Sequence, residues 1–288
     1  MQNLALINLE KIGSFERTNR GLSAQLDNEI LTLDVVKEDL VRVAISRGGK
    51  FDENPTYALA IDPLADSVAK VDFNVTDSQE RIHLITSAMI IEVVKNPFAL
   101  NAYRTDGSTI FESAHNREGE SLAYSYLNDT FAIRRKIGKL DAIYGLGEKT
   151  GTFNRRGRDF TMWNLDVLNP TASGEFTAAH PGTDPRSDIT STEFDPYYMT
   201  IPFFYHQDAK TSAISGSYID NSYRGFYDFT ASDTYEIRFS GGQFTEFIFA
   251  GPSMASVLED YLANWSNQSS ATLGFGFSPM PLERLCSG

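Results

Sequence analysis

The sequence has little cysteine and no long hydrophobic run. Its single cysteine, Cys286, in 288 residues excludes an internal disulfide framework, so a reducing, cytoplasmic compartment is the expected location. No segment approaches the ~20 apolar residues of a membrane-spanning helix. Residues 1–11 have neither the basic start nor the apolar stretch of a signal peptide. We therefore expect a cytoplasmic protein without a membrane partner.

Positive charge is also scarce. There are 25 Lys and Arg against 38 Asp and Glu, a formal net charge of −13, which disfavours a nucleic-acid partner. A short basic run at residues 134–136 lies between apolar residues. We predict that this run is a solvated strand edge rather than a binding patch.

Motifs for metal, nucleotide or serine chemistry are missing. The 4 His residues have no Cys or His partner at ligand spacing, so neither a metal nor a cofactor is expected. The glycine-rich string at residues 144–151 lacks the Gly-Lys-Ser/Thr of a phosphate loop, because Glu148 precedes Lys149. The sequence favours glycines that bend a strand at this position.

Period-two patterns and aromatic residues are abundant. Apolar residues alternate with other residues at positions 31–35 and 41–45, and residues 82–94 also favour strand, with a break at Asn96-Pro97. Asp106-Gly107 and Gly241-Gly242 each lie between apolar runs and predict two hairpins. With 20 Phe and 13 Tyr to fill sheet faces, the sequence predicts an all-β, antiparallel sandwich.

Two segments depart from this texture. Residues 171–194 are rich in Thr, Ser, Pro, Gly and Asp and predict a long surface excursion. After Gly251-Pro252-Ser253, apolar residues follow at helical spacing up to Trp265, which predicts a helix.

The string Met-Trp-Asn-Leu-Asp at residues 162–166 is a candidate site. An indole beside a carboxylate and an amide suits a sugar, because the ring face packs on the indole and the polar groups bind hydroxyls. The alternative is structural: Trp163 is buried and Asp166 is merely solvated. The residues alone leave both interpretations open.

Several strings together resemble the N-terminal region of glycoside hydrolase family 31, the α-glucosidase and α-xylosidase family. They keep the family's order and spacing from Tyr144 to Tyr261, and they are Tyr-Gly-Leu-Gly-Glu-Lys-Thr-Gly, Met-Trp-Asn-Leu-Asp, Tyr-Met-Thr-Ile-Pro-Phe-Phe, Ile-Asp-Asn-Ser and a Gly-Pro helix. The resemblance implies a galactose-mutarotase-like supersandwich that normally precedes a catalytic (β/α)₈ barrel in the same chain. It also implies an α-linked oligosaccharide substrate, with Asp166 contacting the sugar and Trp163 beside it.

The catalytic part of that family does not match anything in this sequence. The family's Asp-Met-Asn-Glu string, which carries the nucleophile, does not occur in the 288 residues. Retaining hydrolysis needs two carboxylates about 5 Å apart, so we assign no catalytic residue and expect no hydrolysis by this chain alone. The binding-class alternative is a free carbohydrate-binding module, and a structural alternative is a module that braces a barrel or dimer.

We expect three regions: a β-sandwich at residues 1–250, a linker helix at 251–265 leading toward the missing barrel, and a tail at 266–288. When codons that are permitted for residues 266–288 are read one base later, they can encode the sequence that leads into the barrel in this family. The cysteine of that encoded sequence is fixed by the codons of Met280-Pro281. We therefore expect the tail to be out-of-frame text that truncates the domain. The nucleotide sequence beyond codon 288 tests this hypothesis.

Overall fold

The described residues form strands in antiparallel sheets and one helix. The structure is a computed structural model that describes residues 7–52, 58–59, 62–65, 67–114, 124–127, 130–164, 195–196 and 198–265. The strands, in chain order, are β1 (Ile7–Asn8), β2 (Ile12–Arg17), β3 (Gly21–Leu26), β4 (Glu29–Lys37), β5 (Leu40–Ile45), β6 (Asn74–Asp77), β7 (Arg81–Ile85), β8 (Met89–Lys95), β9 (Phe98–Arg104), β10 (Thr109–Phe111), β11 (Tyr124–Leu127), β12 (Thr130–Lys136), β13 (Ala142–Gly147), β14 (Asp159–Met162), β15 (Thr200–Gln207), β16 (Ile214–Ile219), β17 (Gly225–Asp228), β18 (Thr234–Phe239) and β19 (Phe244–Phe249). The helix is α2 (Met254–Trp265). The predicted excursion at 171–194 and the predicted tail at 266–288 lie outside the described residues.

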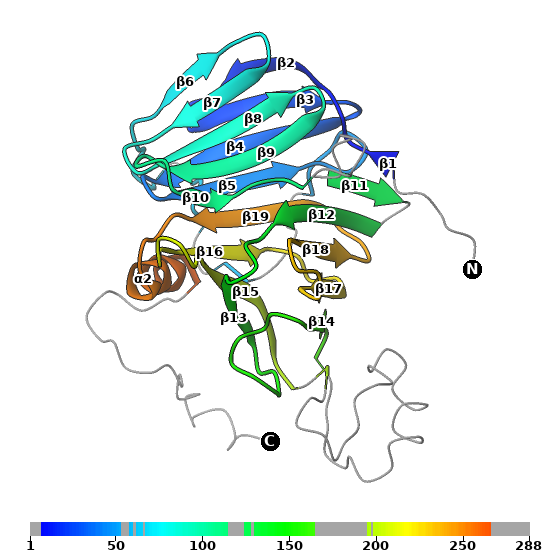
Figure 1. Ribbon diagram of the computed structural model, residues 1–288. Helices are drawn as coiled ribbons and strands as arrows, with labels where there is room; N and C mark the ends of the chain where they lie inside the picture. Colours follow the sequence, from blue (N-terminus) through cyan, green and yellow to red (C-terminus); the bar gives the residue numbers. More distant parts are fainter. Residues whose placement is uncertain are drawn as a thin grey trace, which may run out of the picture.

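The described strands form three sheets. The eight-stranded sheet has the order β13-β15-β16-β19-β5-β4-β3-β2, the five-stranded sheet β10-β9-β8-β7-β6, and the six-stranded sheet β1-β11-β12-β18-β17-β14. Figure 1 shows the five-stranded sheet over the β2–β5 half of the large sheet and the six-stranded sheet along its other half. Buried residues of all three sheets form one continuous cluster, so the predicted all-β sandwich is confirmed.

The large sheet is buried on both faces near its middle. Phe244 and Ile248 of β19 belong to the cluster between the sheets, whereas Phe247 and Phe249 point to the opposite face. There they pack with Val257 and Tyr261 of α2, the helix that the sequence predicted. Because successive side chains of a strand alternate between faces, a strand covered on both sides has no exposed residue, and every residue of β19 is buried.

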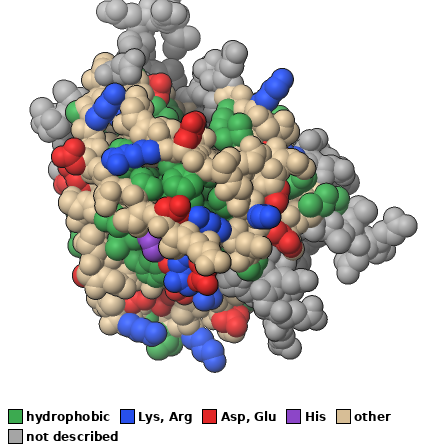
Figure 2. Space-filling model, turned by 90° about the horizontal axis from the view of Figure 1, so that it is seen from above, with side chains coloured by type: hydrophobic (Ala, Val, Ile, Leu, Met, Phe, Trp, Pro, Cys, Tyr) green, Lys and Arg blue, Asp and Glu red, His purple; other side chains and the backbone are tan. Residues whose placement is uncertain are grey.

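The upper end of the molecule is closed by charged side chains. The edge strands β2 and β6 lie there, and the Arg17 guanidinium covers the Phe73 ring at 4.6 Å from its centroid. Lys95 approaches the Phe15 ring at 5.9 Å. Figure 2 shows this face with hydrophobic side chains in the middle and both signs of charge mixed around them. Cations over aromatic rings protect edges that would otherwise invite pairing with another chain.

Two predictions about strands hold in type. Residues 31–35 and 41–45 form parts of β4 and β5, and in β4 the alternation of burial follows the sequence pattern. Asp106-Gly107 does connect the antiparallel strands β9 and β10. Residues 82–94 are extended, but they form two strands, β7 and β8, rather than one.

The hairpin predicted at Gly241-Gly242 is wrong. The strands on either side of it belong to different sheets, because β18 pairs with β12 and β17 whereas β19 pairs with β16 and β5. A Cβ on Gly241 would lie 2.5 Å from the Tyr223 ring, so the two glycines make room for a side chain while the chain crosses between sheets. Sequence patterns cannot distinguish this crossing from a hairpin, since both need two strands and a tight turn.

The interpretation of residues 134–136 as a solvated strand edge is also wrong. They end β12, which lies between β11 and β18 inside the six-stranded sheet, and the Arg135 side chain is only 2% exposed. Its guanidinium forms a two-pronged ion pair with the fully buried Glu246 of β19, across the space between the sheets. On its strand Arg135 lies between the partly exposed Arg134 and the exposed Lys136, and its burial depends on Glu246, a partner far away in the sequence.

A second buried arginine fixes the start of the helix. Arg104, at the end of β9, donates to the backbone oxygen of Ala250 over 2.7 Å and to that of Ile214 over 3.0 Å. Ile214 in turn donates its N–H to Pro252 just before α2. The five-stranded sheet is thereby tied to the corner at which the helix begins. Within the described part of the chain, no helix is long and apolar enough to cross a membrane.

Candidate functional site

A pocket opens at the end of β14, where the string containing Trp163 begins. It has a volume of about 380 Å³ and is lined by Met162, Trp163, Asn164, Thr200, Pro202, Asn221, Ser222, Tyr223 and Phe239. These residues come from the ends of β14, β15 and β18 and from the connection between β16 and β17. The pocket therefore combines segments that are far apart in the sequence.

Two aromatic side chains stand exposed at this pocket. Trp163 is 47% exposed and Tyr223 is 56% exposed, and both contribute to its lining. Exposed aromatic faces beside amide and hydroxyl groups are a surface on which a sugar ring can stack and form hydrogen bonds. The alternative in which Trp163 is a buried core residue is wrong.

The predicted sugar-contacting residues have different outcomes. Trp163 lies at the pocket, whereas Asp166 falls outside the described residues, so its role stays a prediction. Tyr223 was not predicted from the sequence, and Thr200 entered only as a member of the Tyr-Met-Thr-Ile-Pro-Phe-Phe string. An exposed aromatic directly after Asn221-Ser222 was the available signal for Tyr223, but nothing in its spacing separated it from a core aromatic.

Asn221 positions Tyr223. Its side-chain amide donates to the backbone oxygens of Gly241 and Gln243, each at 3.0 Å, and its Oδ1 accepts the N–H of Tyr223 at 2.8 Å. The ring of Tyr223 lies across the backbone of Gly241 and Gly242. The Ile-Asp-Asn-Ser string thus builds this side of the pocket by fixing a turn.

Asn164 fixes the opposite side in a similar way. Its Oδ1 accepts both the N–H of Thr200, at 2.8 Å, and the Thr200 hydroxyl, at 2.7 Å. This contact joins the chain just after Trp163 to the start of β15. The side-chain oxygen of Asn164 therefore holds the pocket wall in place through these two hydrogen bonds.

The glycine-rich string supports the pocket from behind. Gly145, Leu146 and Gly147 all have positive φ, and the register between β13 and β15 shifts there. A Cβ on Gly147 would lie 2.7 Å from the backbone nitrogen of Ile201, so the strands approach too closely for a side chain. The interpretation of these glycines as the cause of a strand bend is confirmed.

Lys149 follows this bend, and its side chain is completely buried. Its Nζ donates to the backbone oxygen of Thr161 over 2.7 Å and forms an ion pair with Asp195 at 2.8 Å. Burial lowers the pKa of Lys149, and the Asp195 carboxylate opposes that effect. With 0% of its side chain exposed, Lys149 is not available to a phosphate or another ligand.

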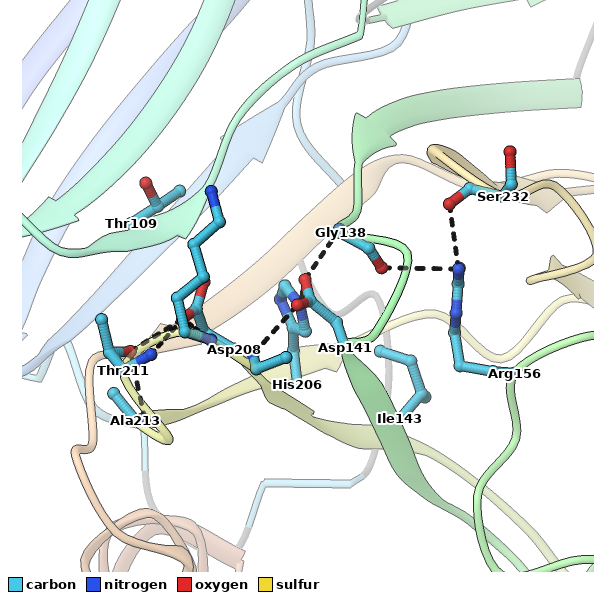
Figure 3. Close-up of polar contacts among 12 residues, drawn as sticks. Thr109, Gly138, Asp141, Ile143, Arg156, His206, Asp208, Thr211, Ala213 and Ser232 are labelled. Carbon is cyan, nitrogen blue, oxygen red and sulfur yellow. Dashed lines mark hydrogen bonds and ion pairs between the residues drawn. The ribbon is translucent and has the colours of Figure 1, made fainter.

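A second polar cluster lies at the other end of β15 (Figure 3). Asp141 accepts hydrogen bonds from His206 Nε2 and the Gly138 N–H, both at 2.8 Å, and from the Ala209 N–H at 3.0 Å. Burial favours its protonated form, but these hydrogen bonds prevail and hold the pKa of Asp141 well below its usual range. The cluster pins loops together, and at ~3.3 Å per residue His206 is roughly 20 Å along β15 from Thr200.

Comparisons with known proteins agree with this architecture. Residues 30–228 match the family described as the glycosyl hydrolase 31 N-terminal galactose mutarotase-like domain. Alpha-glucosidase 2 of Bacillus thermoamyloliquefaciens is 29% identical over 256 residues, which cover 88% of this chain and 29% of that protein. The isomaltosyltransferase of Sporosarcina globispora is 24% identical over 241 residues, covering 80% of this chain and 17% of that protein.

Solved structures show the same fold. A glycoside hydrolase family 31 dextranase of Flavobacterium johnsoniae, in complex with isomaltotriose, superposes with a TM-score of 0.73 at 21% identity, over 90% of this chain and 28% of its own. The chain therefore spans under a third of the length of these relatives. The fold, the pocket strings and the match over residues 30–228 lead to one conclusion: the chain belongs to the glycosyl hydrolase 31 N-terminal galactose mutarotase-like domain family.

Proposed function

We propose that this domain supplies one wall of the sugar-binding pocket of an α-glucosidase-type enzyme. The complete enzyme hydrolyses terminal α-glucosidic bonds of oligosaccharides by a retaining double displacement, with both catalytic carboxylates on a barrel that normally belongs to the same chain. Asp166 binds a hydroxyl of the sugar, and Trp163 forms the adjacent apolar wall. A cytoplasmic location is part of this proposal and is supported by the absence of any cysteine before Cys286.

The observation that carries the proposal is the exposed indole of Trp163 at a pocket lined by both apolar and polar side chains, three residues before Asp166 in the sequence. Relatives with the same domain are described as an alpha-glucosidase and as a dextranase in complex with isomaltotriose. Both names point to α-linked glucose oligomers as the substrate class. The amphipathic lining of the pocket suits such a ligand, because sugar rings present apolar faces and polar edges.

The proposal is tested in a family member that has both the barrel and the Trp-Asn-x-Asp string. In that protein the aspartate that corresponds to Asp166 is changed to alanine. We expect kcat/KM to fall by a factor that corresponds to about 1–3 kcal/mol of transition-state stabilisation, the value of a lost charged hydrogen bond. Unchanged kinetics would favour the bracing role instead. The chain itself is expected to show no hydrolysis of maltose or isomaltose.

The second candidate function is a free carbohydrate-binding module. It is favoured by the exposure of both Trp163 and Tyr223 in the domain on its own. Calorimetry with isomaltotriose separates the two functions, because a free module binds with a Kd of about 1 mM or tighter. A pocket wall that needs the barrel gives no measurable heat under the same conditions.

A further inference from the structure

The Lys149–Asp195 pair serves the backbone next to Trp163. Lys149 Nζ binds the backbone oxygen of Thr161 at 2.7 Å, and Asp195 Oδ2 accepts the Thr161 N–H at 2.6 Å. The ion pair itself, between Nζ and Oδ1 at 2.8 Å, completes a triangle of contacts among Lys149, Asp195 and Thr161. Both side chains are at most 4% exposed, so the triangle is closed to water.

The triangle provides the hydrogen bonds that a neighbouring strand would otherwise provide to Thr161. Thr161 belongs to β14, the last strand of the six-stranded sheet in the described part of the chain, and β17 pairs with it on one side only. On the open side, a backbone N–H and C=O need partners once they are buried. The carboxylate and the ammonium provide them in the way that a neighbouring strand would.

A second tie lies on the other side of Trp163. Asn164 Oδ1 accepts the N–H and the hydroxyl of Thr200, as described above. Trp163 is thus held between two fixed points, Thr161 two residues before it and Asn164 directly after it. Both ties lead to the segment from Asp195 to Thr200, which itself is anchored to β13 because the Glu148 N–H donates to Met199 over 2.8 Å.

We propose that the Lys149–Asp195 ion pair is a positioning device for Trp163: it fastens the chain before the indole to the segment after Asp195 and so fixes the aromatic wall of the pocket. The inference deepens the proposed function and rests on it for the identity of the ligand. Charge is used here because a lysine can reach a backbone oxygen and a carboxylate together. A hydrophobic pair of the same size would fill the space but leave both groups of Thr161 unpaired.

Trp163 reports on its own position by fluorescence. The chain has 2 Trp residues, so a Trp265→Phe background leaves Trp163 as the sole indole. In this background the full chain is compared with the same chain carrying Lys149→Met and Asp195→Leu together, a pair that offers no hydrogen-bond partner to Thr161. The double change removes both charges at once, so that neither is left buried without its partner, and the domain is expected to fold.

The expected result is a mobile indole. Acrylamide quenching of Trp163 is expected to rise by about twofold and its steady-state anisotropy to fall in the double variant, because local motion of the ring is no longer restrained. The control is Leu84→Ala, which removes packing from a fully buried residue of the five-stranded sheet. It lowers stability but is expected to leave the quenching of Trp163 unchanged well below its unfolding temperature.

Two results would overturn the positioning role: equal quenching with and without the ion pair, or an equal rise in Leu84→Ala. A separate arm adds isomaltotriose to the folded parent chain and to a barrel-containing relative, and records protection of the indole. Absence of protection in both, with the quenching difference intact, removes the sugar assignment and leaves the positioning role standing.

Discussion

The ion pair between Arg135 and Glu246 offers a direct test of how the core is held. Arg135 Nη1 donates to Glu246 Oε1 at 2.7 Å, and Ser217 donates its hydroxyl to the same oxygen at 2.6 Å. Arg135 also lies 3.6 Å from the centroid of the Phe111 ring. Burial alone would lower the pKa of Arg135, but the Glu246 carboxylate raises it above its usual value, so Arg135 stays charged.

Removing one partner leaves the other charge buried without compensation. The Glu246→Leu and Arg135→Met variants are each expected to lose about 3–5 kcal/mol of unfolding free energy. In the double variant no charge is left behind, and we expect it to lose less than either single variant, on the order of 2 kcal/mol or below. The pair thus adds little net stability although breaking it is costly.

Equilibrium unfolding in guanidinium chloride, followed by circular dichroism, measures these differences. The neighbouring pair of Arg134 and Glu236 is the control, since its side chains are 22% and 24% exposed. Arg134→Met is expected to cost about 1 kcal/mol or less. Single losses below about 1 kcal/mol at the buried pair, or a double loss equal to the sum of the single losses, would refute the reasoning.

Three further substitutions test other parts of the domain. Burial and the Asp260 carboxylate raise the pKa of Asp39 to about 6, above its unfolded value, so the stability of the domain falls as pH rises through 6. For a half-buried group this fall is about 1 kcal/mol, and Asp39→Asn should remove it. Denaturant midpoints at acid and at neutral pH measure the difference. The lowered pKa of Asp141 has the opposite sign: its stabilisation is present above about pH 4 and is lost as pH falls, and Asp141→Asn should cost on the order of 1 kcal/mol at neutral pH but little in acid. Gly147→Ala forces a Cβ against the backbone of β15 and should lower the melting temperature more than Gly107→Ala, where φ is also positive but no atom lies within 4 Å; equal shifts would contradict the role of close approach.

The sequence predicts elements whose burial follows local alternation. The stretch 31–35 of β4 is an example, because Leu31, Leu33 and Val35 lie in the core between the sheets and alternate with partly exposed polar residues. The helix α2 is another, since its start has a proline and Ser253 accepts the Ser256 N–H at 3.1 Å as a helix cap. In both cases neighbours in sequence determine the structure.

Features that depend on partners distant in the sequence could not be predicted in this way. Arg135 looks like a surface residue until Glu246, on a strand of another sheet, is placed opposite it. Gly241-Gly242 has the sequence pattern of a hairpin turn, but in the structure the Tyr223 ring packs against these two glycines. The pocket has the same character: Trp163 could be proposed from its string, but Tyr223 enters only when the connection between β16 and β17 is brought beside β14.

The clamp formed by Arg104 has a mechanical consequence. Its guanidinium holds Ala250 and Ile214, and Ile214 donates to Pro252, so the chain leaves the sandwich through a joint shared by three segments. A pull on the end of α2 is therefore spread over β9, β16 and β19 instead of peeling one strand from an edge.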